Sequence, residues 1–322
     1  MYDMMLSILF LLGGFLFLIK GADWLVEGAS SIAERAGVSQ LVIGLTLVSF
    51  GTSTPELFIN LISRLSGDED MTVGNIIGSN IANILLILGV SAAFRPLTLK
   101  RSTVYWEIPF AAAMAVLLYF FSASGRLDDR SALQLSRIEG TILLGFFLGF
   151  LAYIFVMQKR DRRPLGDTQG SRTLKTSMIY LTGGVLGLAF GAKAVVQGGV
   201  DLATFLGVPE SVIALSVIAL GSTLPEMLTS VVAAMKSRSD IAVGNIVGSN
   251  IFNICWILGL SAVIRPLSMT ASYLMDAAIM IGASVLLFAF VFLNRTRLLS
   301  RLQGITFVIL YGVYMTMLVF RN

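Results

Sequence analysis

The sequence contains no histidine, a single cysteine and few charged residues. Charged side chains make up 13% of the 322 residues, whereas a soluble globular domain has about 25%. The lone Cys255 excludes an internal disulfide, and the lack of other cysteines excludes a CxxC metal or redox motif. Apolar residues are abundant instead: 56% of the chain is hydrophobic and the mean hydropathy is +0.85. These values exclude an ordinary soluble domain and indicate a polytopic membrane protein.

Roughly ten apolar stretches are long enough to cross a bilayer as helices. The N-terminus runs directly into the first stretch without a short basic segment and cleavage site, so we expect an uncleaved helix there. The predicted fold class is an all-α membrane protein with ten transmembrane helices. The expected spans are residues 4–26, 39–64, 71–93, 102–123, 136–157, 176–199, 209–235, 240–263, 271–293 and 300–320.

The positive charges predict the orientation of the chain. The net charge is +4, but its cations are spread through short loops, which favours a membrane protein over a nucleic-acid partner. Alternate loops carry 15 Lys and Arg residues on one side and 6 on the other. We therefore expect a multi-pass protein of the cell (plasma or inner) membrane, with both termini outside and the basic 159–175 loop in the cytoplasm. The lipid bilayer is the expected partner, and no obligatory protein partner is evident.

The chain repeats itself after 170 residues. LVIGLTLVSFGTSTPE at 41–56 aligns with SVIALSVIALGSTLPE at 211–226, and about 25 of the 57 pairs between 41–97 and 211–267 are identical. Each copy holds five spans, an odd number, so the second copy enters the membrane from the opposite side. Inverted repeats of this kind are typical of secondary transporters, which bind substrates at the midplane on broken helices. The predicted division is 1–158, a linker at 159–175, and 176–322.

Each copy places a proline and a glutamate inside an apolar span, in GTSTPE at 51–56 and GSTLPE at 221–226. Proline lacks an amide hydrogen and clashes with the preceding turn, so we expect helices 2 and 7 to be broken there. The freed carbonyls and nearby hydroxyls are good cation ligands in a polar cavity. A kinked helix with a snorkelling glutamate could account for one such motif. Two equivalent intramembrane carboxylates, Glu56 and Glu226, favour function instead.

A second motif follows each proline, GNIIGSNIANI at 74–84 and GNIVGSNIFNI at 244–254. Within each motif a serine and an asparagine lie four residues apart and therefore share one helical face. These pairs are Ser79 with Asn83 and Ser249 with Asn253. The remaining asparagines lie on other faces, where we favour helix–helix hydrogen bonding or capping over ion binding. They are Asn75, Asn80, Asn245 and Asn250.

All the candidate ligands are oxygen donors. Hard oxygen ligands select Na⁺, Ca²⁺ or Mg²⁺ over soft transition metals, and calcium takes six to eight oxygens in a flexible cage. The candidate set is Thr52, Ser53, Glu56, Ser79 and Asn83 with Ser222, Thr223, Glu226, Ser249 and Asn253.

At these motifs the chain resembles the cation/calcium exchanger superfamily, and within it the prokaryotic type of sodium/calcium exchanger. The resemblance covers nearly the whole chain and implies that helices 2, 3, 7 and 8 form a central diamond with up to four cation sites. It further implies that Glu56 and Glu226 are carboxylates shared by Na⁺ and Ca²⁺. The other roles it implies are calcium ligation by the carbonyls of Thr52 and Ser222, sodium ligation by Ser53 with Ser79 and by Thr223 with Ser249, and sodium ligation by the carbonyls of Ser49 and Ala219.

One residue departs from the pattern of some family members, which carry an acidic residue where Asn253 stands. Asparagine at both 83 and 253 leaves two formal negative charges, which one Ca²⁺ or two Na⁺ balance. The leading hypothesis is Na⁺/Ca²⁺ antiport by alternating access, without a cofactor and without enzymatic chemistry. The alternatives are Ca²⁺/H⁺ antiport through the same glutamates and a cation channel. A receptor or scaffold role would leave the duplicated carboxylates unexplained.

Overall fold

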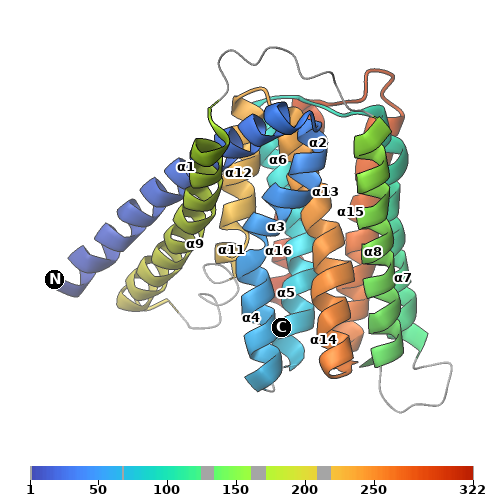
Figure 1. Ribbon diagram of the computed structural model, residues 1–322. Coiled ribbons are helices and arrows are strands. Elements are labelled where there is room, and N and C mark those ends of the chain that lie inside the picture. Colours follow the sequence, from blue (N-terminus) through green and yellow to red (C-terminus); the bar gives the residue numbers. More distant parts are fainter. Residues whose placement is uncertain (1, 67–68, 125–133, 161–171, 209–218, 322) are drawn as a thin grey trace.

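The computed structural model describes residues 2–66, 69–124, 134–160, 172–208 and 219–321 as a bundle of long helices (Figure 1). Eight of the described helices are long and apolar enough to cross a membrane, and one bent pair raises the count to nine. The tenth predicted span, 209–235, lies partly outside the described residues. Its described end is the apolar helix α12, Leu224–Met235.

The described helices follow the predicted spans closely in chain order. Several contain a π-helical segment, labelled η. The helical elements are α1 (Tyr2–Ala36), α2 (Gln40–Ile43), η1 (Gly44–Val48), α3 (Ser49–Thr52), α4 (Thr54–Ser66), α5 (Glu69–Ala82), η2 (Asn83–Leu88), α6 (Gly89–Phe94), η3 (Thr103–Glu107), α7 (Ile108–Ser124), α8 (Arg137–Arg160), α9 (Leu174–Phe205), α11 (Ala219–Gly221), α12 (Leu224–Met235), α13 (Ser239–Ile251), η5 (Phe252–Leu258), α14 (Gly259–Ile264), α15 (Ala271–Phe292) and α16 (Arg301–Arg321).

Two helices are longer than the sequence predicts. The spans expected at 4–26 and 176–199 extend to Tyr2–Ala36 and Leu174–Phe205, because their polar ends remain helical. Ion pairs explain why the end of α1 continues. Glu27 binds Arg172 at 2.5 Å and Lys236 at 2.8 Å, and Lys236 also binds Asp23.

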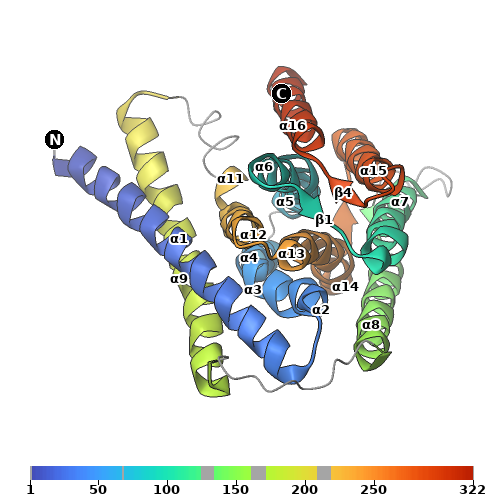
Figure 2. The same cartoon turned by 90° about the horizontal axis from the view of Figure 1, so that it is seen from above.

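The seam between α1 and α9 is lined by glycine at intervals of seven residues. The two helices lie side by side in both views, outside the rest of the bundle (Figure 2). A Cβ added at Gly21 would lie 2.7 Å from the backbone nitrogen of Leu188, and one at Gly184 would lie 2.5 Å from that of Leu25. Absence of side chains at these positions therefore lets the two backbones approach closely, as small residues do between membrane helices.

The centre of the bundle is the span formed by α13, η5 and α14. Every residue from Ile241 to Ile251 is buried, and five of these positions are glycine, serine or asparagine. Such a composition suits a helix that faces other helices on all sides. The α5–η2–α6 span is also largely buried, and α2–α3–α4 and α12 pack beside α13 (Figure 2). Polar groups of both predicted copies are thereby brought into one buried core.

The two predicted copies are interleaved and do not form two separate bodies. Strand β1 (Leu97–Thr98) pairs with β4 (Leu298–Leu299), and β2 (Gln134–Leu135) pairs with β3 (Leu267–Ser268), both antiparallel. The last helix of each copy packs on the other copy, since α16 contacts α6 and α8 contacts α14. The division into inverted repeats stays a prediction drawn from the sequence.

Equivalent capping boxes start the last helix of each copy. Ser136 N donates to Glu139 Oε2 at 2.6 Å and Glu139 N donates to Ser136 Oγ at 3.3 Å, at the start of α8. Ser300 and Gln303 make the same reciprocal pair at the start of α16, at 2.9 and 3.4 Å. Each box satisfies two amides that have no partner within the helix.

The predicted linker at 159–175 begins and ends inside helices, because α8 continues to Arg160 and α9 begins at Leu174. Residues 161–171 lie outside the described part of the chain. Arg172, shortly before α9, keeps 37% of its side-chain surface exposed. Its guanidinium lies 3.8 Å from the ring centroid of Tyr180 in addition to pairing with Glu27.

Loops that the charge count assigns to one side of the membrane do gather at one end of the bundle. Lys100 pairs with Asp240 at 2.8 Å, and Leu99 N donates to Arg297 O at 2.9 Å. Two loops assigned to the opposite side also contact one another, since the Arg137 guanidinium donates to Ile264 O at 3.4 Å. Which end faces the cytoplasm stays a prediction.

Candidate cation site

The second span is interrupted at the residues that precede its glutamate. Helix α3 ends at Thr52, Ser53 has φ −85° and ψ 4°, and α4 begins at Thr54. The helix axis bends by 44° across this break, next to Pro55. The proline explains the position, because it cannot donate to the carbonyl one turn earlier.

The equivalent segment of the second copy is interrupted in the same way. Helix α11 ends at Gly221, and α12 begins at Leu224 with Pro225 in its first turn. Ser222 and Thr223 therefore lie between two helices, as Ser53 does in the first copy. Both glutamates follow directly, in the first turn of α4 and of α12, where the helix dipole favours an anion.

The two glutamates are buried, each with 1% of its surface exposed. Ser53 Oγ donates to Glu226 Oε1 at 2.9 Å and lies 2.9 Å from Ser249 Oγ. Three predicted ligands from three different spans, Ser53, Glu226 and Ser249, thus meet in one cluster.

Among the described residues, four buried side-chain oxygens of the predicted ligands have no hydrogen-bond partner. They are Oε2 of Glu56 and Glu226 and Oδ1 of Asn83 and Asn253, two equivalent atoms from each copy. An unpaired buried oxygen is costly, and in native proteins such an atom usually marks a bound ion or water or a functional role. All four belong to the predicted ligand set.

The asparagines form two equivalent hydrogen bonds between the copies. Asn83 Nδ2 donates to Asn250 Oδ1 at 2.8 Å, and Asn253 Nδ2 donates to Asn80 Oδ1 at 3.1 Å. The predicted role of Asn80 and Asn250 in helix–helix hydrogen bonding is confirmed. The side-chain nitrogens of Asn83 and Asn253 donate in these contacts, while their Oδ1 atoms accept no hydrogen bond from the described residues. We call these two contacts the amide clasp.

Several of the other predicted ligands make hydrogen bonds of their own, and that of Thr52 joins the two copies. Thr52 Oγ1 donates to Asn245 Oδ1 at 3.0 Å, Thr223 Oγ1 donates to Leu220 O at 2.9 Å, and Ser49 O accepts the amide of Ser53 at 2.9 Å. Ser79 is buried and Ser222 is half-buried. Ala219 is the first residue of α11 and is described only by its backbone. Thr223 does not reproduce toward Glu56 the contact that Ser53 makes with Glu226.

Two buried residues near the glutamates were missed by the sequence interpretation. Asn60 Nδ2 donates to the backbone oxygen of Glu56 at 2.6 Å, and Ser230 Oγ accepts from Asn245 Nδ2 at 3.0 Å. Both follow their glutamate by four residues and occupy equivalent positions of the repeat. A polar residue one turn after each glutamate was the signal that could have identified them.

The charge of the site comes from two carboxylates. Among the described residues there is no group of three or more His, Cys, Asp or Glu side chains that could hold a metal ion. Any cation bound here would therefore take its remaining ligands from hydroxyl, amide and backbone oxygens. That donor set fits a hard cation such as Na⁺ or Ca²⁺.

Comparisons with known proteins agree with this geometry. The sequence model of the sodium/calcium exchanger protein family matches residues 6–156 and 176–320. The chain is 32% identical to the sodium/calcium exchanger MaX1 of Methanosarcina acetivorans, over 89% of this chain and 91% of that protein. It is 34% identical to the inner membrane protein YrbG of Escherichia coli, over 78% of each.

A solved structure has the same fold. The sodium-calcium exchanger NCX_Mj, soaked with Na⁺ and without Ca²⁺, matches with a TM-score of 0.83 and 27% identity, over 97% of this chain and 99% of that one. The all-helical bundle and the multi-pass membrane class are thereby shown. The chain belongs to the sodium/calcium exchanger family, in the prokaryotic branch of the cation/calcium exchanger superfamily.

Proposed function

We propose that this protein exchanges Na⁺ for Ca²⁺ across the membrane by alternating access, with the ions bound at the midplane between the two copies. Glu56 and Glu226 are the carboxylate ligands shared by both ions. The hydroxyls of Ser53, Ser79, Thr223 and Ser249, the amides of Asn83 and Asn253, and the backbone oxygens of Ser49, Thr52, Ala219 and Ser222 complete the ligand set.

The observation that carries this proposal is the set of four unpaired buried oxygens on Glu56, Glu226, Asn83 and Asn253. A packed core leaves such atoms unsatisfied only rarely, and here they occur at equivalent positions of both copies. A cation among them would supply the missing partner of all four. The family match and the name of MaX1 support Na⁺ and Ca²⁺ as the ions.

Charge sets a limit on what is exchanged. Two ionised carboxylates balance one Ca²⁺ or two Na⁺, whereas three Na⁺ would leave one excess positive charge in a low-dielectric core. Such an uncompensated charge is costly. We therefore expect that two Na⁺ compete with one Ca²⁺, and that exchange in this ratio moves no net charge.

Ca²⁺/H⁺ antiport is the second candidate, because two protons on Glu56 and Glu226 would neutralise the same pair. Both carboxylates are buried, so a site without a cation would need protons or another cation to balance their charge. A cation channel is the candidate from a different class. A channel would conduct down a gradient and would not couple one ion to the other.

The test is ⁴⁵Ca²⁺ uptake into proteoliposomes that contain the purified protein. An outward Na⁺ gradient should drive uptake, and a pH gradient alone should not. Glu56→Gln and Glu226→Gln should each abolish Na⁺-driven uptake. The matched control is Glu139→Gln, a carboxylate-to-amide change at a capping box outside the site, which glutamine can also complete. Uptake near the parent level in either site variant contradicts the assignment.

Uptake driven by pH and insensitive to Na⁺ would favour the Ca²⁺/H⁺ antiporter. The channel predicts a third result: ⁴⁵Ca²⁺ would equilibrate without any counter-ion, and unlabelled Ca²⁺ inside the vesicles would not accelerate its entry. A membrane potential should leave the rate unchanged if exchange moves no net charge.

A further inference from the structure

Asn245 of α13 joins the two broken spans through one buried side chain. Its Oδ1 accepts from Thr52 Oγ1 at 3.0 Å, at the end of α3. Its Nδ2 donates to Ser230 Oγ at 3.0 Å and to the backbone oxygen of Glu226 at 3.4 Å, both on α12. The side chain is fully buried, so solvent does not compete for these contacts. One amide thus holds the residue before the first break and the glutamate after the second.

The surroundings fix the direction in which this amide points. The backbone oxygen of Glu226 can only accept a hydrogen bond, so the side-chain nitrogen of Asn245 must face it. The amide oxygen therefore faces Thr52, whose hydroxyl can donate. Because its nitrogen and its oxygen are both engaged within the protein, Asn245 is a poor cation ligand. Its contacts are those of a residue that orients the ligands around it.

The equivalent asparagine of the first copy makes no such tie among the described residues. Asn75 and Asn60 occupy the positions of Asn245 and Ser230 in the repeat. Asn75 Nδ2 and Asn60 Oδ1, a donor and an acceptor, are both buried without a hydrogen-bond partner. The backbone oxygen of Glu56 accepts instead from Asn60 Nδ2 of its own helix, at 2.6 Å. The two copies therefore hold their glutamates in different ways.

Thr52 needs an anchor because its helix ends there. Helix α3 stops at Thr52, and the next residue, Ser53, has ψ 4°. The last carbonyls of a helix have no partner within it, so their direction depends on other contacts. The Thr52 hydroxyl lies 3.0 Å from Asn245 Oδ1 and 3.3 Å from Ser49 O, so its contact with the other copy is the shorter. Asn245 therefore steadies the peptide of Thr52 from the other copy.

We propose that Asn245 is a positioning residue that sets the preference of the cation site for Ca²⁺ over Na⁺. The inference rests on the proposed function, in which the backbone oxygen of Thr52 is a calcium ligand and the two glutamates bind both ions. The bond between Asn245 and Thr52 holds that oxygen toward the ion. Calcium depends on a full cage of oxygen ligands, so loss of this bond weakens Ca²⁺ binding more than Na⁺ binding.

Two substitutions remove the tie and leave every proposed ligand atom in the chain. Thr52→Val removes the hydroxyl but keeps the backbone oxygen and the shape of the side chain. Asn245→Leu removes the whole amide, and it also releases the backbone oxygen of Glu226. The matched control is Asn75→Leu, the same change at the equivalent asparagine, whose nitrogen has no partner.

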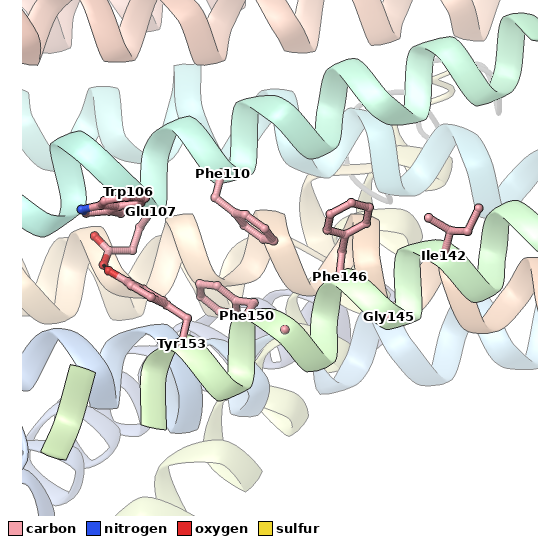
Figure 3. Close-up of a pocket in the computed structure, with 9 residues that line it drawn as sticks. Trp106, Glu107, Phe110, Ile142, Gly145, Phe146, Phe150 and Tyr153 are labelled. Carbon is pink, nitrogen blue, oxygen red and sulfur yellow. Dashed lines mark hydrogen bonds between the residues drawn. The ribbon is translucent and has the colours of Figure 1, made fainter. Parts of the chain in front are cut away.

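A second control, Tyr153→Phe, removes a buried hydrogen bond outside the cation site. Tyr153 of α8 donates its hydroxyl to Glu107 Oε1 at 2.7 Å, and Figure 3 shows the two side chains pointing toward one another. None of the described residues that line the groove around them is a proposed ligand. Like Thr52→Val, this substitution deletes one hydroxyl that joins two segments of the bundle.

The experiment measures equilibrium binding of ⁴⁵Ca²⁺ to the purified protein in nanodiscs, and its displacement by Na⁺. Thr52→Val should weaken Ca²⁺ binding about fivefold, as expected for one lost hydrogen bond, and Na⁺ binding at most about twofold. Asn245→Leu should weaken Ca²⁺ binding about tenfold or more, because two contacts to the breaks are lost. The double variant should bind Ca²⁺ no more weakly than Asn245→Leu, which already lacks the bond to Thr52. Asn75→Leu and Tyr153→Phe should bind both ions as the parent does.

Equal losses of Ca²⁺ and Na⁺ affinity in Thr52→Val would overturn the inference, since a general loosening of the site weakens both ions. Unchanged Ca²⁺ affinity in Thr52→Val overturns it as well, and this variant decides alone if Asn245→Leu fails to fold. Failure of the proposed function gives a different pattern. The parent would then bind no Ca²⁺, or Glu226→Gln would bind it as well as the parent does, and the inference falls with the proposed function.

Discussion

Replacing Asn250 with alanine removes the acceptor that holds the side chain of Asn83. In the parent protein Asn83 Nδ2 donates to Asn250 Oδ1 at 2.8 Å, which leaves Asn83 Oδ1 free to serve as a cation ligand. Without that acceptor, rotation of the amide by half a turn would place its nitrogen among the ligands. A nitrogen that carries two hydrogens repels a cation, so the variant should bind Ca²⁺ more weakly.

The size of the effect follows from the contact that is lost. A hydrogen bond contributes about 0.5–1.5 kcal/mol net in proteins, and bonds between membrane helices average about 0.6 kcal/mol. Loss of roughly 1 kcal/mol of orientational preference corresponds to about a fivefold change in an equilibrium constant. We therefore expect Asn250→Ala to raise the Ca²⁺ concentration for half-maximal uptake about three- to tenfold.

The assay is Na⁺-driven ⁴⁵Ca²⁺ uptake in proteoliposomes, as a double-mutant cycle of Asn83→Ala, Asn250→Ala and the double variant. The single effects should not add, because either change destroys the same contact. Ser122→Ala is the control. It removes a buried hydroxyl of α7 that donates to Leu118 O at 2.7 Å, and should leave the half-maximal concentration unchanged. Additive effects in the cycle, or an unchanged half-maximal concentration in Asn250→Ala, would refute the reasoning.

Three further outcomes are expected. Asn253→Asp should make exchange more dependent on pH. An aspartic acid can donate to Asn80 Oδ1 as the amide does only when it is protonated. A pH profile equal to that of the parent would show that residue 253 does not face the ions. Gly21→Ala should lower the melting temperature by several degrees, because its Cβ would lie 2.7 Å from a backbone atom. Gly13→Ala is the control, since its Cβ would have no atom within 4 Å. Thermal unfolding followed by tryptophan fluorescence compares the two variants, and equal melting temperatures would contradict the close contact between α1 and α9. A cysteine introduced at Thr296 should react with an impermeant thiol reagent only from the cytoplasmic side, since Cys255 is buried, and labelling from outside would reverse the predicted orientation.

The sequence was sufficient to predict those features that follow from local chemistry. Proline next to glutamate predicts a break, and the structure bends by 44° beside Pro55. Helical periodicity separates Asn83 from Asn80, and the structure leaves the oxygen of the first unpaired while the second accepts a bond from the other copy. The apolar runs gave helix ends within a few residues for most spans.

Features that depend on distant contacts could not be predicted in this way. The extra turns of α1 persist because Lys236 and Arg172, far along the chain, pair with its acidic end. The last helix of each copy packs on the other copy, and strand pairs such as Leu97 with Leu299 accompany this arrangement. Strands of two residues have no recognisable sequence pattern, so these pairs could not be predicted.

The amide clasp has the form of an isologous interface. In a twofold homodimer, a residue of one subunit contacts a different residue of the partner, and the reverse contact occurs as well. Here one chain makes both contacts: the bond from Asn83 to Asn250 recurs as the bond from Asn253 to Asn80. Each half carries one donor and one acceptor, so the seam is self-complementary. Two identical halves placed face to face would therefore form the same pair of bonds.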